Sequence, residues 1–252
     1  HDGFMDVFVA NLAHPRFLDF SDKARLYMSS GGPDPVFEDV TEAAGLRFQE
    51  TAGGAIAWDY DNDGDLDLLW NCIYAERPSQ FYRNDWPDGG WTEVTYPTGL
   101  RVTNGWEVAI ADLDDDGDLD YASNKLFLNR NPWDRKSIQV RPLGRGLGGT
   151  NRDGFGARVR VMVEGVERMQ EKVPSSAISN QSSPWLHFGI GQAETADVTV
   201  DFPVSGESYS FVSLAAGRYT VDEDGNLRVL GFFRAVCRRG PSRWPSLCCH
   251  CG

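Results

Sequence analysis

The chain has 252 residues, of which 41% are hydrophobic, and a formal net charge of −13. This length and apolar content suffice for one or two domains with a core. Phosphate binding needs clustered lysine and arginine, so the acidic balance argues against nucleic acid as a partner. No apolar run approaches the roughly 18 residues that a membrane-spanning helix needs, and we expect no membrane span in this chain.

The acidity and the cysteines are unevenly distributed. Residues 1–136 carry 26 acidic side chains against 11 basic ones. Four of the five cysteines lie in the last sixteen residues, and Cys72 stands alone in the body of the chain. This spacing is not that of a disulfide framework, so it does not indicate the redox compartment.

Residues 1–131 form a repeat array. Each unit has an aspartate-rich loop between two apolar strands, then a strand at residues 25–27, 80–82 or 125–127. A further strand follows, with the aromatic-acid-Val-Thr pattern that begins at Phe37 and returns at Trp91. About four short strands per repeat of some fifty residues is typical of a propeller blade. We therefore predict a partial β-propeller of about two and a half blades.

The aspartate-rich loops at residues 59–67 and 112–120 both read D-x-D-x-D-G-D-L-D. Carboxylates at loop positions 1, 3, 5 and 9, with a carbonyl at position 7, are the hard oxygen donors that Ca²⁺ prefers. The glycine at position 6 allows the sharp reversal that turns them inward. Two like charges about 4 Å apart repel by roughly 4 kcal/mol at an effective dielectric of about 20, so the converging carboxylates need a cation. The candidate ligands are Asp59, Asp61, Asp63, Asp65 (carbonyl) and Asp67 in the first of these loops, and Asp112, Asp114, Asp116, Asp118 (carbonyl) and Asp120 in the second.

The chain opens inside an earlier copy of the same loop, without an initiator methionine. Alignment places Asp2 at position 5 and Asp6 at position 9, and both are candidate ligands. Positions 1 and 3 would precede His1. We therefore expect the sequence to be the C-terminal part of a longer protein, with any targeting segment upstream.

Other interpretations of the loops are open or weaker. An EF-hand needs a bidentate glutamate at position 12, where these loops have Trp70 and Ser123. Paired carboxylates also cleave glycosides, but both loops would then have to be catalytic. A pair of solvated acidic turns is the remaining alternative, although chance rarely repeats the same register twice.

The loops and the trailing F-x-D-V-T-x-x-A-G-L pattern resemble the FG-GAP/VCBS repeats of integrin-like β-propellers. The resemblance implies that the aspartates above are calcium ligands. In the first, cut loop only Asp2 and Asp6 match the pattern.

Residues 129–136 read as a linker, and alternating strand patterns follow it at residues 137–143, 156–163 and 197–202. No convincing helical period appears, so we predict an all-β chain. Residues 137–226 resemble the ASPIC/UnbV domain, through residues 151–159, 181–191 and 202–206, and we expect a small β-sandwich-like module. Residues 175–180 replace a glycine-rich turn usual in that family, and Phe202 stands where tryptophan is common.

Other chemical motifs in this second region are better explained as structure. Residues 144–149 satisfy G-x-G-x-x-G, but a strand follows rather than the helix that dinucleotide binding requires. Among four histidines only His187 is a plausible catalytic base, and a histidine packed on a sheet face is the commoner case. Asn180 lies in a glycosylation sequon that also reads as a polar turn. Residues 232–252, with Cys-Cys-His-Cys, lack the spacing of a zinc site, and we predict a disordered tail.

The order of FG-GAP/VCBS repeats and ASPIC/UnbV domain is that of proteins similar to the cartilage acidic protein family and of many bacterial surface or secreted proteins. It implies a non-enzymatic, calcium-binding scaffold or adhesion-type protein, extracellular or at the cell surface. Such a protein would present a rigid surface to a protein or carbohydrate ligand. The alternative is an enzyme or accessory protein of secondary-metabolite (enediyne-like) biosynthesis.

Overall fold

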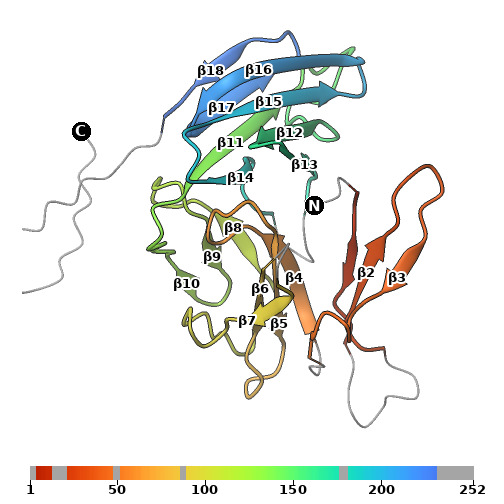
Figure 1. The fold of residues 1–252 in the computed structure, drawn as a ribbon, viewed down its shortest axis with the longest axis vertical. Coiled ribbons are helices and arrows are strands. Elements are labelled where there is room, and N and C mark those ends of the chain that lie inside the picture. Colours follow the sequence, from red (N-terminus) through yellow and green to blue (C-terminus); the bar gives the residue numbers. More distant parts are fainter. Residues whose placement is uncertain (1–3, 13–21, 48–51, 86–88, 176–180, 232–252) are drawn as a thin grey trace, which may run out of the picture.

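The computed structural model describes residues 4–12, 22–47, 52–85, 89–175 and 181–231, and these residues form an all-β structure (Figure 1). Eighteen strands make five sheets, and no helix occurs among the described residues. Accordingly, none of the described segments is a helix long and apolar enough to cross a bilayer. The all-β prediction is confirmed.

Three antiparallel sheets make up the first part of the chain, each with its strands in chain order. They contain β1 (Val7–Val9), β2 (Arg25–Ser29) and β3 (Phe37–Asp39); β4 (Ala52–Trp58), β5 (Asp67–Cys72), β6 (Gln80–Asn84) and β7 (Trp91–Glu93); and β8 (Ala109–Ala111), β9 (Asp120–Ala122) and β10 (Leu126–Phe127). The prediction of about two and a half blades is wrong. Each of the three repeats forms its own sheet, because backbone pairing of β1 with β2 completes a sheet even where the preceding loop is cut short.

The repeated strands predicted from the sequence are confirmed, and neighbouring sheets share apolar cores. Trp70 of β5 stacks on Tyr82 at 5.2 Å between ring centroids and lies 5.1 Å from Phe8 of the first sheet. Trp58 and Phe81 of the second sheet belong to a buried cluster with Tyr121 of the third. Burial of such large rings supplies most of the cohesion between short strands.

Two four-stranded sheets make up the second part of the chain. One has the order β14-β11-β17-β18 and the other β13-β12-β15-β16. Their strands are β11 (Lys136–Leu143), β12 (Arg158–Val163), β13 (Val166–Glu171), β14 (Leu186–Gly191), β15 (Thr195–Phe202), β16 (Glu207–Ala215), β17 (Gly217–Asp222) and β18 (Leu227–Val229). β11 and β17 run parallel, and all other pairs are antiparallel.

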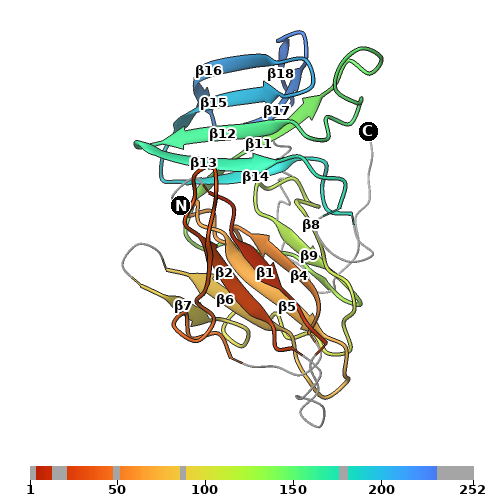
Figure 2. The same ribbon diagram turned by 90° about the vertical axis from the view of Figure 1, so that its right-hand side faces the viewer.

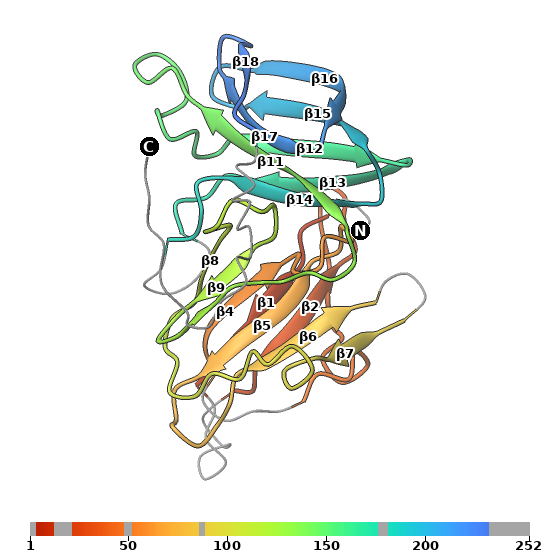
Figure 3. The same ribbon diagram turned by 90° about the vertical axis from the view of Figure 1, so that its left-hand side faces the viewer.

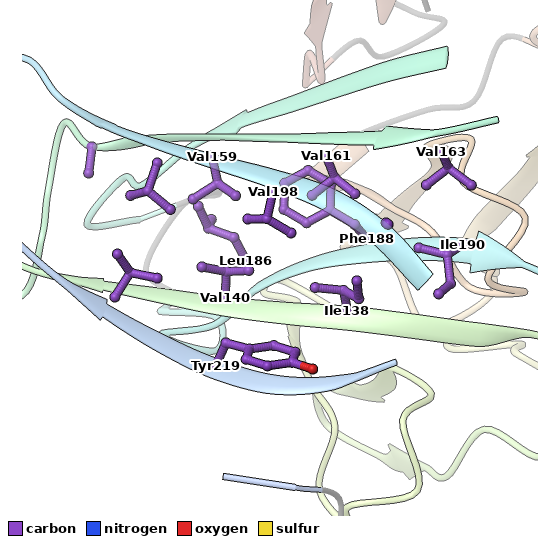
Figure 4. Close-up of a cluster of buried hydrophobic side chains, with 14 of the residues drawn as sticks. Ile138, Val140, Val159, Val161, Val163, Leu186, Phe188, Ile190, Val198 and Tyr219 are labelled. Atoms are coloured by element: carbon purple, nitrogen blue, oxygen red, sulfur yellow. The ribbon is translucent and has the colours of Figure 1, made fainter. Parts of the chain in front are cut away.

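The two sheets share one core (Figure 4). The alternation predicted for β12 places Val159, Val161 and Val163 on its buried face, opposite Ile138 and Val140 of β11. Residues 144–149 begin the connection between β11 and β12, so no helix follows the glycine-rich motif and it does not have the dinucleotide-binding context.

The second part of the chain lies across the loop end of the first part (Figures 1, 2 and 3). Backbone hydrogen bonds join the two directly: Gly191 N donates to Asn62 O at 2.9 Å, and Ser183 N donates to Ile110 O at 2.9 Å. The aspartate loops therefore lie at a junction rather than in open solvent. The predicted domain boundaries at residues 131, 137 and 226 stay predictions, and the predicted tail lies outside the described residues.

Candidate metal centre

The loops at residues 59–67 and 112–120 have the same backbone conformation. Position 6 has φ of 94° in both (Gly64 and Gly117), where glycine is needed. Position 4 has φ of 58° in both (Asn62 and Asp115), a left-handed conformation that asparagine and aspartate tolerate best after glycine. The repeated sequence register thus produces the same three-dimensional loop twice.

The aspartate at position 1 closes each loop. Asp59 Oδ2 accepts a hydrogen bond from Gly64 N at 2.9 Å, and Asp112 Oδ2 accepts one from Gly117 N at 3.0 Å. Both aspartates are buried, with 2% and 9% of their surface exposed. A buried carboxylate requires compensation by hydrogen bonds or a cation.

The aspartate at position 9 ties each loop to the next strand. Asp67 Oδ2 accepts from Tyr60 N at 3.1 Å and Asp67 Oδ1 from Asn84 N at 2.9 Å. Asp120 repeats the pattern with Leu113 N and Asn129 N, both at 2.7 Å.

Asp6 occupies the equivalent place in the cut loop, since its Oδ1 accepts from Ser29 N at 2.8 Å. The alignment that placed Asp6 at position 9 is therefore supported by geometry. Asp2 lies outside the described residues.

The aspartate at position 3 leaves one oxygen without a protein partner. Asp61 Oδ1 and Asp114 Oδ1 are buried atoms with no hydrogen-bond donor, and Asp59 Oδ1 is a third such atom. Asp61 as a whole is only 2% exposed. A buried, unpaired carboxylate oxygen is costly unless a cation lies beside it.

These oxygens belong to two groups that could hold a metal ion. In each group, ligand atoms from three carboxylates lie within 4.8 Å of one another. The groups are Asp59, Asp61 and Asp67 in one loop, and Asp112, Asp114 and Asp116 in the other. Three hard oxygen donors at one point fit a divalent cation of the calcium type, which prefers carboxylate and carbonyl oxygens over nitrogen or sulfur.

An arginine from residues 129–136 bridges the Oδ2 atoms of positions 3 and 5 of each loop. The pairs are Arg135 Nη1 with Asp61 Oδ2 (2.8 Å) and Asp63 Oδ2 (3.5 Å), and Arg130 Nη1 with Asp114 Oδ2 (2.6 Å) and Asp116 Oδ2 (3.3 Å). The predicted linker therefore packs on both loops.

The electrostatics of the loops disfavour charged carboxylates in the absence of a cation. Burial, and then repulsion from Asp61, raises the pKa of Asp63 to about 6. Burial is also the main reason why the pKa of Asp118 is raised to about 7 and that of Asp120 to about 6. The pKa of Asp59 is raised well above its usual range by burial, with Asp63 as the next cause. A bound cation would offset these penalties.

Asp65 and Asp118 are predicted to ligate through their backbone carbonyls, and the structure also shows what surrounds their side chains. Burial raises the pKa of Asp65. The Asp118 carboxylate accepts a hydrogen bond from Asn62 Nδ2 at 2.7 Å. Ligation by any of the twelve predicted residues stays a prediction.

Sequence reasoning missed Asn62, which joins both loops to the second part of the chain. Asn62 Nδ2 donates to Asp118 Oδ1, so Asn62 Oδ1 is the acceptor that meets His187 Nε2 at 2.7 Å. His187 therefore donates through Nε2, and its other nitrogen, Nδ1, is buried without a partner. Within the loop, the feature that marks Asn62 is its left-handed φ, which the structure shows and the sequence does not.

His187 is a neutral structural residue in this arrangement. It is 4% exposed, and burial, followed by repulsion from Arg218, lowers its pKa to about 3. The expectation that this histidine packs at a sheet face matches its position in β14. Among the described residues the lone cysteine, Cys72, is buried and forms no disulfide.

Comparisons with known proteins match both parts of the chain. A family model described as "FG-GAP-like repeat" matches residues 59–123. A second, described as "ASPIC and UnbV", matches residues 147–227. The chain joins an FG-GAP-like repeat region to an ASPIC and UnbV region.

No curated protein matches the chain. A solved structure from Bacteroides uniformis ATCC 8492, described as a "putative cell adhesion protein", is similar at 12% identity, with 72% of this chain and 91% of that chain covered. Its TM-score is 0.25, so this likeness carries no argument about the fold or function of the FG-GAP-like and ASPIC and UnbV regions.

Proposed function

We propose that the chain is a non-enzymatic, calcium-binding scaffold of the cell surface or extracellular space, in which Ca²⁺ bound to each aspartate loop rigidifies the FG-GAP-like sheets. The observation that carries the proposal is the set of buried carboxylate oxygens without a protein partner, Asp59 Oδ1, Asp61 Oδ1 and Asp114 Oδ1. Asp61 and Asp114 occupy the same position, position 3, of two loops with the same conformation. A bound calcium ion would supply the partner that these oxygens do not find in the protein.

The scaffold role follows from where the loops attach. Each loop connects two paired strands, and its last aspartate accepts a hydrogen bond from a backbone amide at the end of the third strand (Asn84 of β6) or just after it (Asn129 after β10). A cation on the loop would therefore fix three strands at once. The rigid surface would serve contact with a protein or carbohydrate ligand, in keeping with the FG-GAP-like repeats.

The environment of His187 does not favour the enzyme alternative. His187, the histidine singled out from the sequence, is buried and uncharged, and its Nε2 is engaged by Asn62. A general base needs access to the proton that it removes.

Isothermal titration of the metal-stripped chain with CaCl₂ tests the proposal. We expect two binding sites in the parent chain, one in Asp61→Asn, one in Asp114→Asn and none in the double variant. Glu164→Gln is the matched control, because it removes one negative charge at an exposed turn of the second part of the chain. A parent chain that takes up no calcium, or a double variant that still takes up two ions, would refute the proposal.

A further inference from the structure

The sheet β14-β11-β17-β18 provides hydrogen-bond donors to the first aspartate of both loops. Gly189 N of β14 donates to Asp59 Oδ2 at 3.0 Å. Gln139 Nε2 of β11 donates to Asp112 Oδ2 at 2.9 Å. Arg218 of β17 reaches the same Asp112 oxygen at 3.0 Å. Three adjacent strands of one sheet thus hold the position-1 carboxylates of two loops.

The contact at Gly189 requires glycine because the backbone of β14 lies too close to the loop for any side chain. Its φ is not left-handed, but a Cβ at this position would lie 2.2 Å from Asp59 Oδ2 and 2.5 Å from the backbone of Asn62. Both obstacles are buried and belong to the loop. Strand β14 can therefore lie against the loop only with a bare backbone at residue 189.

The contact at Gln139 is equally constrained. Gln139 is 1% exposed, and its Oε1 accepts from Arg218 Nε at 2.8 Å, which turns its amide nitrogen toward Asp112. Arg218 also pairs with Asp115 at position 4 of the same loop. The charge of this loop is thus partly balanced from the second part of the chain.

At Asp59 these donors leave the other carboxylate oxygen free of protein partners, whereas Asp112 Oδ1 accepts a hydrogen bond from Asp116 N at 3.2 Å within its own loop. At Asp59, Oδ2 is used by Gly64 N and Gly189 N, whereas the buried Oδ1 has no partner. Groups that hydrogen-bond to a ligating carboxylate orient it, and their loss typically weakens metal affinity 10- to 100-fold.

We infer that the sheet β14-β11-β17-β18 is the outer coordination shell of both loops, so that calcium binding and docking of the two parts of the chain stabilise each other. The inference rests on the proposed calcium sites and deepens them by assigning their regulation. Gly189, Gln139 and Arg218 are positioning residues rather than ligands. By thermodynamic linkage, if docking of the two parts raises the calcium affinity by a given factor, bound calcium favours the docked state by the same factor.

Crossed variants test the first half of the inference. In the Asp114→Asn background, calorimetry reports the loop at residues 59–67 alone, and Gly189→Ala is expected to raise its calcium Kd by about 10- to 100-fold. In the Asp61→Asn background, Gln139→Leu is expected to raise the Kd of the loop at residues 112–120 by a similar factor, whereas Gly189→Ala changes it less than about threefold. Gly90→Ala is the matched control, because a Cβ there meets nothing within 4 Å.

The outcomes separate the two proposals. If neither background binds calcium, the proposed function fails and the inference falls with it. If both backgrounds bind calcium and the crossed variants leave their own loops within about twofold of the background, only the inference is overturned.

Limited trypsin digestion tests the second half on the parent chain, without any variant that might misfold. Calcium is expected to slow cleavage after Arg130, Arg135 and Lys136 at least tenfold relative to chelator, because undocking exposes this segment. Cleavage after Arg152, in an exposed turn of the second part of the chain, is the internal reference for the activity of trypsin itself. Equal protection at all four sites, or none, in a chain that binds calcium would overturn the coupling.

Discussion

Asn62 is the side chain whose removal should reveal how strongly the two loops and the second part of the chain are joined. It is 1% exposed, and its amide bonds to the carboxylate of Asp118 at 2.7 Å and to His187 at 2.7 Å. Asn62→Ala would remove this partner from the buried His187 and from the half-buried Asp118 carboxylate. His187 would then have no partner on either ring nitrogen, since Nδ1 already lacks one.

The expected cost follows from these contacts. Above the pKa of Asp118, about 7, its carboxylate is charged and the bond from Asn62 contributes about 2 kcal/mol, while the neutral bond to histidine contributes about 1 kcal/mol. Alanine at φ of 58° adds about 1 kcal/mol of backbone strain. We therefore expect Asn62→Ala to lower the free energy of unfolding by about 4 kcal/mol, the sum of these contributions.

A matched control isolates the hydrogen bonds from the strain. Asn104 has φ of 56° but an exposed side chain, so Asn104→Ala should cost only the strain, about 1 kcal/mol. Urea unfolding of both variants, in chelator and in calcium, measures the difference. A difference below about 1 kcal/mol would refute the claim that Asn62 is a structural junction.

Three further outcomes can be measured on the same chain. Unfolded aspartates release their protons near pH 4, whereas burial raises the pKa of Asp63 and Asp120 to about 6 in the folded protein. The metal-free protein therefore loses the contribution of these two groups to stability as the pH rises from about 4 to 6. The rise in Tm caused by calcium should therefore grow over that interval, and a constant rise would contradict it. Glu223 accepts hydrogen bonds from the backbone amide and the hydroxyl of Thr150. Although burial acts to raise it, the pKa of Glu223 is lowered to about 2 by these bonds and by the bond from the amide of residue 145. The contribution of Glu223 to stability is therefore complete above about pH 4.5 and is lost as the pH falls toward 2. Glu223→Gln should cost about 2 kcal/mol at pH 7 and less at pH 3, and equal costs at both values would count against this account. Trp70→Ala should cost about 4 kcal/mol in thermal or urea unfolding, because the side chain is 1% exposed between two aromatic rings; a cost under about 1.5 kcal/mol would show that the first two sheets do not share this core.

The sequence by itself determined the features of this protein that depend only on residues close together in the chain. The strands on either side of each loop, the turns at residues 164–165 and 224–225, and the loop register follow from local apolar alternation and from glycine placement. Position 9 could be assigned even in the cut loop, where Asp6 accepts a backbone hydrogen bond as Asp67 and Asp120 do in the complete loops. The blade count failed because the spacing of motifs does not show whether a truncated repeat still pairs its strands.

Only the tertiary structure decided what surrounds the loops. Gly189 is 130 residues from Asp59 in the chain, and His187 is 125 residues from Asn62. No local pattern encodes contacts over such separations, because they depend on how one sheet lies against another. The carboxylates that could bind metal can therefore be identified from the sequence. The hydrogen-bond donors that orient them can be identified only from the packing of the two parts of the chain.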